Sequence, residues 1–269
     1  MEPSADPHLK ATVTDYFARD DAATQWWTID TDTPGVYAKQ LELVRAHVQP
    51  ADKSALDVAT GQGRFAIELA RGGANVTAVD ISPAMVDRAQ ANAERDGVAD
   101  RIRFEVGDAA ALGLPDASFD VVSIMEVLVH LPDPAAVLRS VARLLKPGGT
   151  LVTNYHTPAA PRIDYPVYRA RIAWLRLTRR LPQRVVMPDT VEEAVQLLDE
   201  GPRNDLIVMR PKEAYQGIPA RAVNRWLAEA GLERVAEMRE HIKVLGVPVP
   251  IPIGRTVVAR RPGDAASSP

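Results

Sequence analysis

The sequence predicts an α/β protein built on a doubly wound, mostly parallel sheet. Three features of the chain indicate this fold. Between residues 55 and 152, short β-branched apolar runs alternate with helical stretches, which is the pattern of successive βαβ units. A glycine-rich turn joins the first apolar run to the first helix. Near the C-terminus one helix is followed by two strands, which fits a sheet whose last strand inserts antiparallel.

The elements of the predicted core follow one another in a regular order. Strands are expected over 56–58, 76–80, 102–106, 119–124 and 150–154, with helices over 64–71, 83–96 and 135–145. Ser82 fits the N-cap of the second helix and Pro83 its first position, where a backbone N–H would have no helical partner in any case. Gly97 is expected to end this helix. The turn Lys146-Pro147-Gly148-Gly149 is expected to separate the third helix from the fifth strand.

The pattern divides the chain into five parts. We expect an N-terminal helical cap over 1–50, a cofactor-binding core over 51–155, a lid or substrate insertion over 156–215, a part completing the core sheet over 216–261, and a disordered tail over 262–269. Within the fourth part, a helix is expected over 220–230 and strands over 233–243 and 255–260. The alternating prolines of 246–254 lack amide donors and predict an extended loop or sheet edge there.

Composition excludes several classes of function. The chain has 269 residues, of which 46% are hydrophobic, and 32 Lys and Arg against 35 Asp and Glu give a net charge of −3. This balance argues against a general nucleic-acid binder. The absence of cysteine excludes thiolate nucleophiles, disulfides and Cys-ligated metals. The first residues do not form a secretory signal, and no later stretch reaches about 18 uninterrupted apolar residues. We therefore expect a soluble, cytoplasmic protein.

The glycine turn is compatible with two classes of cofactor. Gly61-x-Gly63-x-x-Ala66 fits a dinucleotide fingerprint, in which Asp80 at the end of the next strand would hold a ribose. On that interpretation the chain is an NAD-dependent dehydrogenase.

Two further acids favour S-adenosylmethionine instead. Asp57 lies inside the turn motif, where a carboxylate can meet the ammonium of a methionyl group, and a dinucleotide has no counterpart to that ammonium. Asp108 follows the third strand and is placed to accept from an adenine amino group. Together with Asp80, these acids end three successive strands, where open α/β sheets bind their ligands.

On these motifs the chain resembles the class I S-adenosylmethionine-dependent methyltransferases, with a Rossmann-like core, and in particular the ubiquinone/menaquinone type. The resemblance covers 55–152 well and 220–260 loosely. Asp57 to Gly63 is similar to the first family motif, with Ala59 in the place of a common glycine, and Asp80 to Met85 is similar to the second. The cofactor-binding residues that the resemblance implies are Asp57, Ala59, Gly61, Gly63, Asp80, Ile81, Met85, Asp108, Ala109 and Met125.

The segment after the fourth strand, residues 125–134, resembles that of quinone-type O-methyltransferases. Some relatives use Glu-x-x-Glu-His here to bind a metal, but Val129 replaces the second Glu, so we expect no metal. The Asn/Asp-Pro-Pro-Tyr signature of enzymes that methylate nucleic-acid amines is absent after Ile124. This absence argues against a nucleic-acid substrate.

A hydroxyl acceptor needs a general base, and two histidines follow strand ends. His156 comes after the fifth strand and His130 after the fourth, so both are candidate catalytic residues. Each also has a structural interpretation, as a packing residue for His130 and as a loop residue for His156.

Substrate selection is expected outside the common core. The candidate substrate-binding residues are the aromatic side chains Tyr16, Trp27, Tyr155, Tyr168 and Trp174. Seven arginines between Arg162 and Arg184 line the predicted lid, and a helix there can cover an apolar acceptor, meet a carboxylate, lie peripherally on an anionic membrane or simply face solvent.

The sequence therefore predicts methyl transfer from S-adenosylmethionine to a small, fairly apolar metabolite, with a hydroxyl as the preferred acceptor. The alternatives are a C- or N-methyltransferase, a protein of this fold that binds the cofactor without transferring a methyl group, and the NAD-dependent dehydrogenase. The sequence specifies neither the acceptor molecule nor the oligomeric state.

Overall fold

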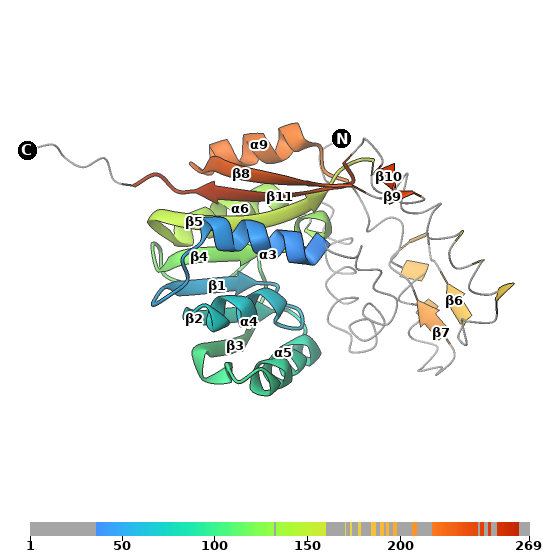
Figure 1. The fold of residues 1–269 in the computed structure, drawn as a ribbon, viewed down its shortest axis with the longest axis horizontal. Helices are drawn as coiled ribbons and strands as arrows, with labels where there is room; N and C mark the ends of the chain where they lie inside the picture. Colours follow the sequence, from blue (N-terminus) through green and yellow to red (C-terminus); the bar gives the residue numbers. More distant parts are fainter. Residues whose placement is uncertain are drawn as a thin grey trace, which may run out of the picture.

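The computed structural model describes residues 36–131, 133–159, 217–241 and 252–263, with short pieces between 170 and 208 and between 243 and 248. Its main sheet contains β1 (Ser54–Val58), β2 (Asn75–Asp80), β3 (Ile102–Val106), β4 (Phe119–Ile124), β5 (Leu145–His156), β8 (Glu233–Glu240) and β11 (Gly254–Arg260). The seven strands lie in the order β3-β2-β1-β4-β5-β11-β8 (Figure 1). The predicted fold class is confirmed.

The directions of the strands in the sheet follow the expected pattern. The strands β1 to β5 pair in parallel, whereas β11 runs antiparallel to both of its neighbours, β5 and β8. The last strand thus inserts antiparallel, as predicted. Because β1 to β5 are parallel, their carboxyl ends meet at one edge of the sheet.

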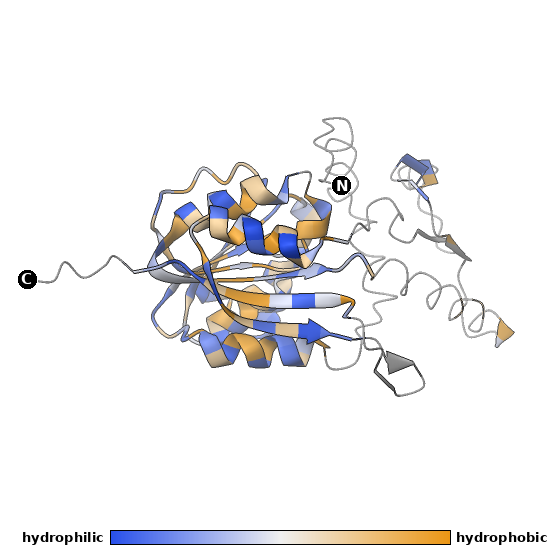
Figure 2. Cartoon of the chain, turned by 90° about the horizontal axis from the view of Figure 1, so that it is seen from above, coloured by the Kyte–Doolittle hydropathy of each residue, from blue (hydrophilic) through white to orange (hydrophobic). Residues whose placement is uncertain are grey.

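Helices cover both faces of this sheet. They are α3 (Val36–His47), α4 (Arg64–Arg71), α5 (Pro83–Arg95), α6 (Pro134–Leu144) and α9 (Ala220–Glu229), with the 3-10 turns η1 (Ala99–Arg101) and η2 (Leu128–His130). One apolar cluster joins the sheet to α3, α4 and α5, and a second joins it to α6 and α9. Figure 2 shows the sheet lying between these helical layers. No helix in the described part of the chain is both long and apolar enough to cross a membrane.

The cap of α5 agrees with the sequence, whereas two other expectations are wrong. The Ser82 hydroxyl accepts from the Met85 N–H at 3.3 Å, which confirms Ser82 as the N-cap of α5. The turn Lys146-Pro147-Gly148-Gly149 does not separate α6 from β5, because β5 begins at Leu145, directly after α6. The single strand expected over 233–243 is wrong. β8 ends at Glu240 because its partner β11 begins at Gly254, which lies opposite that residue. A separate ribbon follows, in which β9 (Lys243–Val244) pairs with β10 (Val247–Pro248).

Two further short strands lie in the region expected to be an insertion. β6 (Arg184–Val186) pairs in parallel with β7 (Leu206–Val208). This pair is separate from the main sheet. The division into cap, core, insertion and tail otherwise stays a prediction, because residues 1–35, most of residues 160–216 and the tail from 264 onward lie outside the described residues.

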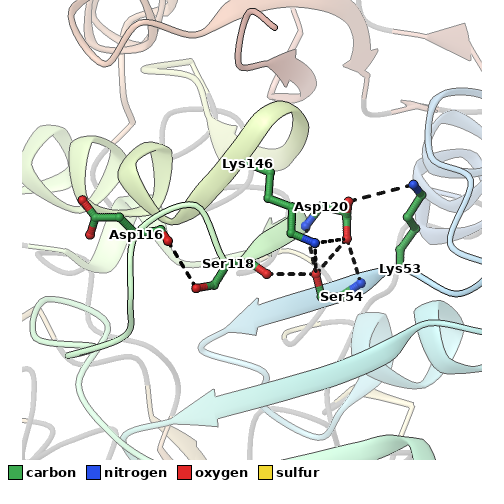
Figure 3. A network of polar contacts seen from close by, with 6 residues as sticks. All are labelled: Lys53, Ser54, Asp116, Ser118, Asp120 and Lys146. Atoms are coloured by element: carbon green, nitrogen blue, oxygen red, sulfur yellow. Dashed lines mark hydrogen bonds and ion pairs between the residues drawn. The ribbon is translucent and has the colours of Figure 1, made fainter. Parts of the chain in front are cut away.

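A polar network ties the amino ends of the central strands together, at the edge opposite the glycine turn (Figure 3). The Asp120 carboxylate accepts from the Ser54 hydroxyl at 2.7 Å and from the Lys146 ammonium at 2.8 Å. Ser54 begins β1, Asp120 lies in β4 and Lys146 lies at the start of β5. Burial alone would raise the pKa of Asp120, but the hydrogen bonds from Lys146 and Ser54 outweigh burial and lower this pKa to about 2.

We expect the Asp120→Asn variant to unfold with a free energy lower by about 1 kcal/mol at pH 7, after allowance for the water that reaches Asp120. Because the pKa is lowered in the folded state, this stabilisation is present above pH 4 and is lost as the pH falls toward 2. Urea unfolding of the two proteins between pH 7 and pH 3 measures the difference. The matched control is Asp116→Asn, which removes an exposed ion pair with Arg143 and should change stability by less than about 0.5 kcal/mol. Equal losses in the two variants would contradict the role of the network.

Candidate functional site

The candidate site begins at the turn between β1 and α4, which has an unusual backbone. Ala59, Gly61 and Gly63 all have positive φ angles, of 53°, 53° and 84°. Glycine adopts this region without penalty, and alanine does so at a cost. The structure thus explains why a glycine would suit position 59 and how the chain bends sharply between β1 and α4. A Cβ built on Gly61 has no atom within 4 Å, so the turn is open on that side.

Asp57 stabilises this turn through three hydrogen bonds. Its carboxylate accepts from the Ser123 hydroxyl at 2.5 Å, from the Thr60 hydroxyl at 2.6 Å and from the Ala66 N–H at 3.2 Å. The last bond caps α4, whose N-cap Gly63 has no side chain to do so. Burial raises the pKa of Asp57 to about 6, although these three hydrogen bonds oppose the shift. Asp57 is therefore first a structural residue, and its contact with a cofactor ammonium stays a prediction.

Asp80 links the turn to the end of β2. Its Oδ2 accepts from the Gly61 N–H at 2.8 Å, and its Oδ1 accepts from the Ser82 N–H at 3.0 Å. Burial raises the pKa of Asp80, while hydrogen bonds from the backbone of Ser82, Gly61 and Ile81 lower it. A carboxylate held in this way keeps lone pairs available for the hydroxyl groups of a ligand lying against the turn.

The remaining residues predicted for the cofactor lie along the same edge of the sheet. The Asp108 side chain accepts from the Ala110 N–H at 2.8 Å, and the neighbouring Gly107 N–H donates to the Asp80 carbonyl at 2.8 Å. Ile81, Met85 and Ala109 are half-buried, and Met125 is buried directly after β4. The structure therefore brings the predicted cofactor residues to the carboxyl ends of β1 to β4, as expected.

A second polar group lies at the carboxyl ends of β4 and β5. His156 Nε2 lies 3.2 Å from Glu126 Oε2. Asn154 bonds the same glutamate twice: its Oδ1 accepts from the Glu126 N–H at 2.6 Å, and its Nδ2 donates to Glu126 Oε1. Glu126 and Asn154 did not emerge as functional residues from the sequence. Their positions after β4 and two residues before His156 on β5 were the available signal.

Glu240 reaches toward this group from the other side. Its Oε1 accepts from the Thr256 hydroxyl at 2.8 Å and from the Gln40 amide at 3.1 Å. It can lie there because Gly254, between Glu240 and His156 in the sheet, has no side chain, and a Cβ at that position would collide with Glu240 Oε2. Burial, followed by the charge of Glu126, raises the pKa of Glu240, while Thr256, Gln40 and the charge of His156 lower it.

Two other candidates lie apart from this group. Tyr155 is only 2% exposed and packs in the apolar cluster of α6 and α9, and its place between Asn154 and His156 on β5 directs it to the opposite face of the sheet. The structure thus gives no support to Tyr155 as a substrate contact. His130 lies in η2, half-buried, and its catalytic role stays a prediction.

The other predicted substrate contacts lie outside the described residues. They are Tyr16, Trp27, Tyr168 and Trp174. The arginines from Arg162 to Arg180 also lie outside the described residues, and with them the predicted membrane contact. Among the side chains that the structure does describe, no group of three His, Asp or Glu is placed to hold one metal ion.

Part of the chain matches a known protein family. Residues 56–153 match the family described as a methyltransferase domain. A ubiquinone biosynthesis O-methyltransferase of Xanthomonas axonopodis pv. citri (strain 306) is 40% identical over 144 residues, which are 51% of this chain and 59% of that protein. A protein of the same name from Xanthomonas campestris pv. campestris (strain B100) is 38% identical over 162 residues, 58% of this chain and 66% of the relative. The chain thus matches about three fifths of the length of such relatives.

Solved structures confirm the fold over a longer stretch. The magnesium protoporphyrin IX methyltransferase of Synechocystis PCC 6803, with bound SAH, covers 94% of this chain with a TM-score of 0.60 at 18% identity. A [4+2]-cyclase covers 84% of the chain with a TM-score of 0.56, also at 18% identity. Because one of these neighbours is a methyltransferase and the other a cyclase, the shared fold alone does not specify a reaction.

Proposed function

We propose that this chain, whose residues 56–153 form a class I S-adenosylmethionine-dependent methyltransferase domain, transfers a methyl group to a hydroxyl of a small, fairly apolar molecule. The observation that carries the choice of a hydroxyl is the pairing of His156 with Glu126 at 3.2 Å, on the sheet edge that also bears the glycine turn. A histidine paired with a carboxylate is suited to removing a proton from a hydroxyl.

The residues around the glycine turn fit S-adenosylmethionine. Asp80, with both oxygens already oriented by backbone N–H groups, would hold the ribose hydroxyls, and the open side of Gly61 leaves room for the cofactor. Asp108 and Ala109 would border the adenine, with Ile81 and Met85 packed on it and Met125 beside the methionyl part. When bound, the cofactor supplies an electrophilic methyl group on a sulfonium.

Charge at the turn favours this cofactor over a dinucleotide. Asp57 and Asp80 are both buried carboxylates, and the charge of Asp80 contributes to the raised pKa of Asp57. A pyrophosphate would add further negative charge beside them, whereas a methionyl group brings an ammonium and a sulfonium. The domain match of residues 56–153 supports the same choice.

The protein itself has to position the acceptor and remove its proton. His156 would accept the proton of the hydroxyl, which increases the negative charge on the acceptor oxygen as it attacks. The relatives from Xanthomonas are named O-methyltransferases of ubiquinone biosynthesis, which agrees with oxygen as the acceptor atom. Substrate selection would belong to residues 1–50 and 156–215, where Tyr16, Trp27, Tyr168 and Trp174 remain candidates.

Calorimetric titration with S-adenosylmethionine, S-adenosylhomocysteine and NAD tests the cofactor part of this proposal. We expect micromolar binding of the first two and no binding of NAD, because the buried carboxylates of the turn disfavour an anionic pyrophosphate. Incubation with the methyl-labelled cofactor and a panel of hydroxylated aromatic acids then tests transfer to oxygen. Binding of NAD alone would overturn the proposal. Cofactor binding without label transfer to any hydroxyl would agree with the proposed fold and cofactor and would contradict the proposed O-methyltransferase activity.

A further inference from the structure

Glu126 has a backbone conformation that its residue type does not favour. Its φ angle is +60°, in the left-handed region where a Cβ crowds the backbone. Residues kept in this region at strand ends usually have surroundings that hold them there, and such positions cluster at functional sites. At Glu126 the support is specific, because the backbone N–H donates to Asn154 Oδ1 at 2.6 Å.

The same amide side chain also fixes the Glu126 carboxylate. Since Asn154 Oδ1 is the atom that accepts from the Glu126 N–H, the Nδ2 group must be the one that meets the carboxylate, and it donates to Oε1. Asn154 is 2% exposed, so its amide is held firmly by the surrounding core. One buried amide therefore determines both where the Glu126 backbone turns and how its carboxylate is oriented.

The orientation of the carboxylate matters for His156. With Oε1 engaged by Asn154, Oε2 is the oxygen that lies 3.2 Å from His156 Nε2. Asn154 and His156 are two residues apart on β5, so their side chains leave the strand on the same side. The His156 side chain is 19% exposed, whereas that of Glu126 is 55% exposed, so the imidazole lies deeper than the carboxylate that it meets.

We propose that Asn154 and Glu126 are positioning residues for His156, an inference that rests on the proposed function. Glu126 would hold the ring proton of the neutral imidazole on Nε2, so that the proton of the acceptor hydroxyl moves to Nδ1. The products of this step are an imidazolium and a deprotonated acceptor oxygen, and the Glu126 carboxylate stabilises the imidazolium. Asn154 acts one step further away, by fixing Glu126. The logic is that of a base oriented by a third group.

The tautomer of His156 is the direct test, and it requires neither cofactor nor acceptor. Long-range ¹H–¹⁵N NMR of the full-length protein at high pH, with the His156→Gln variant to assign the signal, distinguishes Nε2–H from Nδ1–H imidazole. In wild type we expect the Nε2–H form. In Glu126→Gln, Asn154 Nδ2 still donates a hydrogen bond, so the side-chain oxygen of the new glutamine should take the place of Oε1. The amide nitrogen of the glutamine then faces His156 and donates to Nε2, and the tautomer should change to Nδ1–H. An unchanged tautomer would overturn the proposal.

Two further variants separate the carboxylate from the backbone. Glu126→Gly removes the carboxylate and suits a φ of +60°, so it should fold well and show the mixture of tautomers of an unconstrained imidazole, in which Nε2–H predominates beside a detectable share of Nδ1–H. Glu229→Gln is the matched control, because Glu229 is an exposed residue on α9 that pairs with Arg225, and this variant should retain the wild-type tautomer. The same ratio of Nε2–H to Nδ1–H in Glu126→Gly as in wild type would show that the carboxylate does not orient the ring.

Turnover of 3,4-dihydroxybenzoate, a small catechol, measures the catalytic consequence. We expect kcat of Glu126→Gln to fall about tenfold to a hundredfold, a part of the 10²–10⁴ that a general base contributes, with the affinity for S-adenosylmethionine unchanged. A lower cofactor affinity with unchanged kcat would instead indicate a merely structural role and overturn the positioning role. If wild type binds the cofactor but methylates no hydroxyl, the proposed function fails, and the NMR result still decides whether Glu126 orients His156.

Discussion

The Asp80→Ala variant should bind S-adenosylmethionine at least about a hundredfold more weakly than wild type. A hydrogen bond to a charged group is worth about 1.5–3 kcal/mol, and each 1.4 kcal/mol corresponds to a factor of ten in affinity. Asp80 would accept from the ribose hydroxyls, and it also orients the glycine turn through the Gly61 N–H at 2.8 Å. Removing the carboxylate thus takes away a ligand contact and loosens the turn that the ligand meets. Calorimetric titration measures the loss.

The control for this experiment is Asp87→Ala on α5, the helix that follows Asp80 in the chain. Asp87 is exposed on α5, whose first turn begins three residues after Asp80, and its loss leaves the hydrogen bonds of the turn in place. Its cofactor affinity should stay within about twofold of wild type. Thermal unfolding of both variants without ligand shows whether Asp80→Ala remains folded. A folded Asp80→Ala protein with wild-type affinity would place the cofactor somewhere other than this turn.

Much of the cofactor site is predictable because it depends on local signals. A strand, a glycine turn and a helix are contiguous in the sequence, so Asp57, Gly61 and Gly63 are recognisable without any tertiary information. Asp80 follows from the next strand, since parallel strands end at one edge. The structural role of Asp57 as a cap for α4 was less evident, because the bond from the Ala66 N–H to its carboxylate joins a strand to a helix across the turn.

The acceptor side of the site was less accessible to prediction because it depends on register and on one unusual backbone angle. His156 was identifiable from its position after a strand. Its pairing with Glu126 requires β4 and β5 to be aligned so that Ile124 lies opposite Thr153. It also requires Glu126 to adopt a left-handed backbone conformation, which cannot be predicted from the presence of a glutamate in the sequence. Strand alternation alone would have placed Tyr155 on the face opposite Asn154 and His156.

Replacing His156 with alanine should reduce kcat by about 10²–10⁴ and leave the affinity for S-adenosylmethionine unchanged. The expected separation of the two effects follows from the structure: His156 ends β5 and contacts Glu126, whereas the turn that would hold the cofactor is built on β1, β2 and α4. Steady-state methylation of a hydroxylated aromatic acceptor gives kcat, and titration of the same variant gives the cofactor affinity. Added imidazole should restore part of the lost rate if the missing group acted as a base.

Two other histidines provide the comparison that this prediction needs. His47 lies at the end of α3 remote from Tyr37, which contacts Arg64 near the glycine turn, so His47→Ala should retain wild-type turnover. His130 follows β4 as His156 follows β5, and it lies in η2, so it is the alternative candidate for the base. A larger loss of kcat in His130→Ala than in His156→Ala would assign the base to η2. A large loss of kcat in His156→Ala that imidazole partly reverses would instead assign the base to the end of β5. There the buried amide of Asn154 fixes the Glu126 carboxylate, and this carboxylate contacts the His156 imidazole.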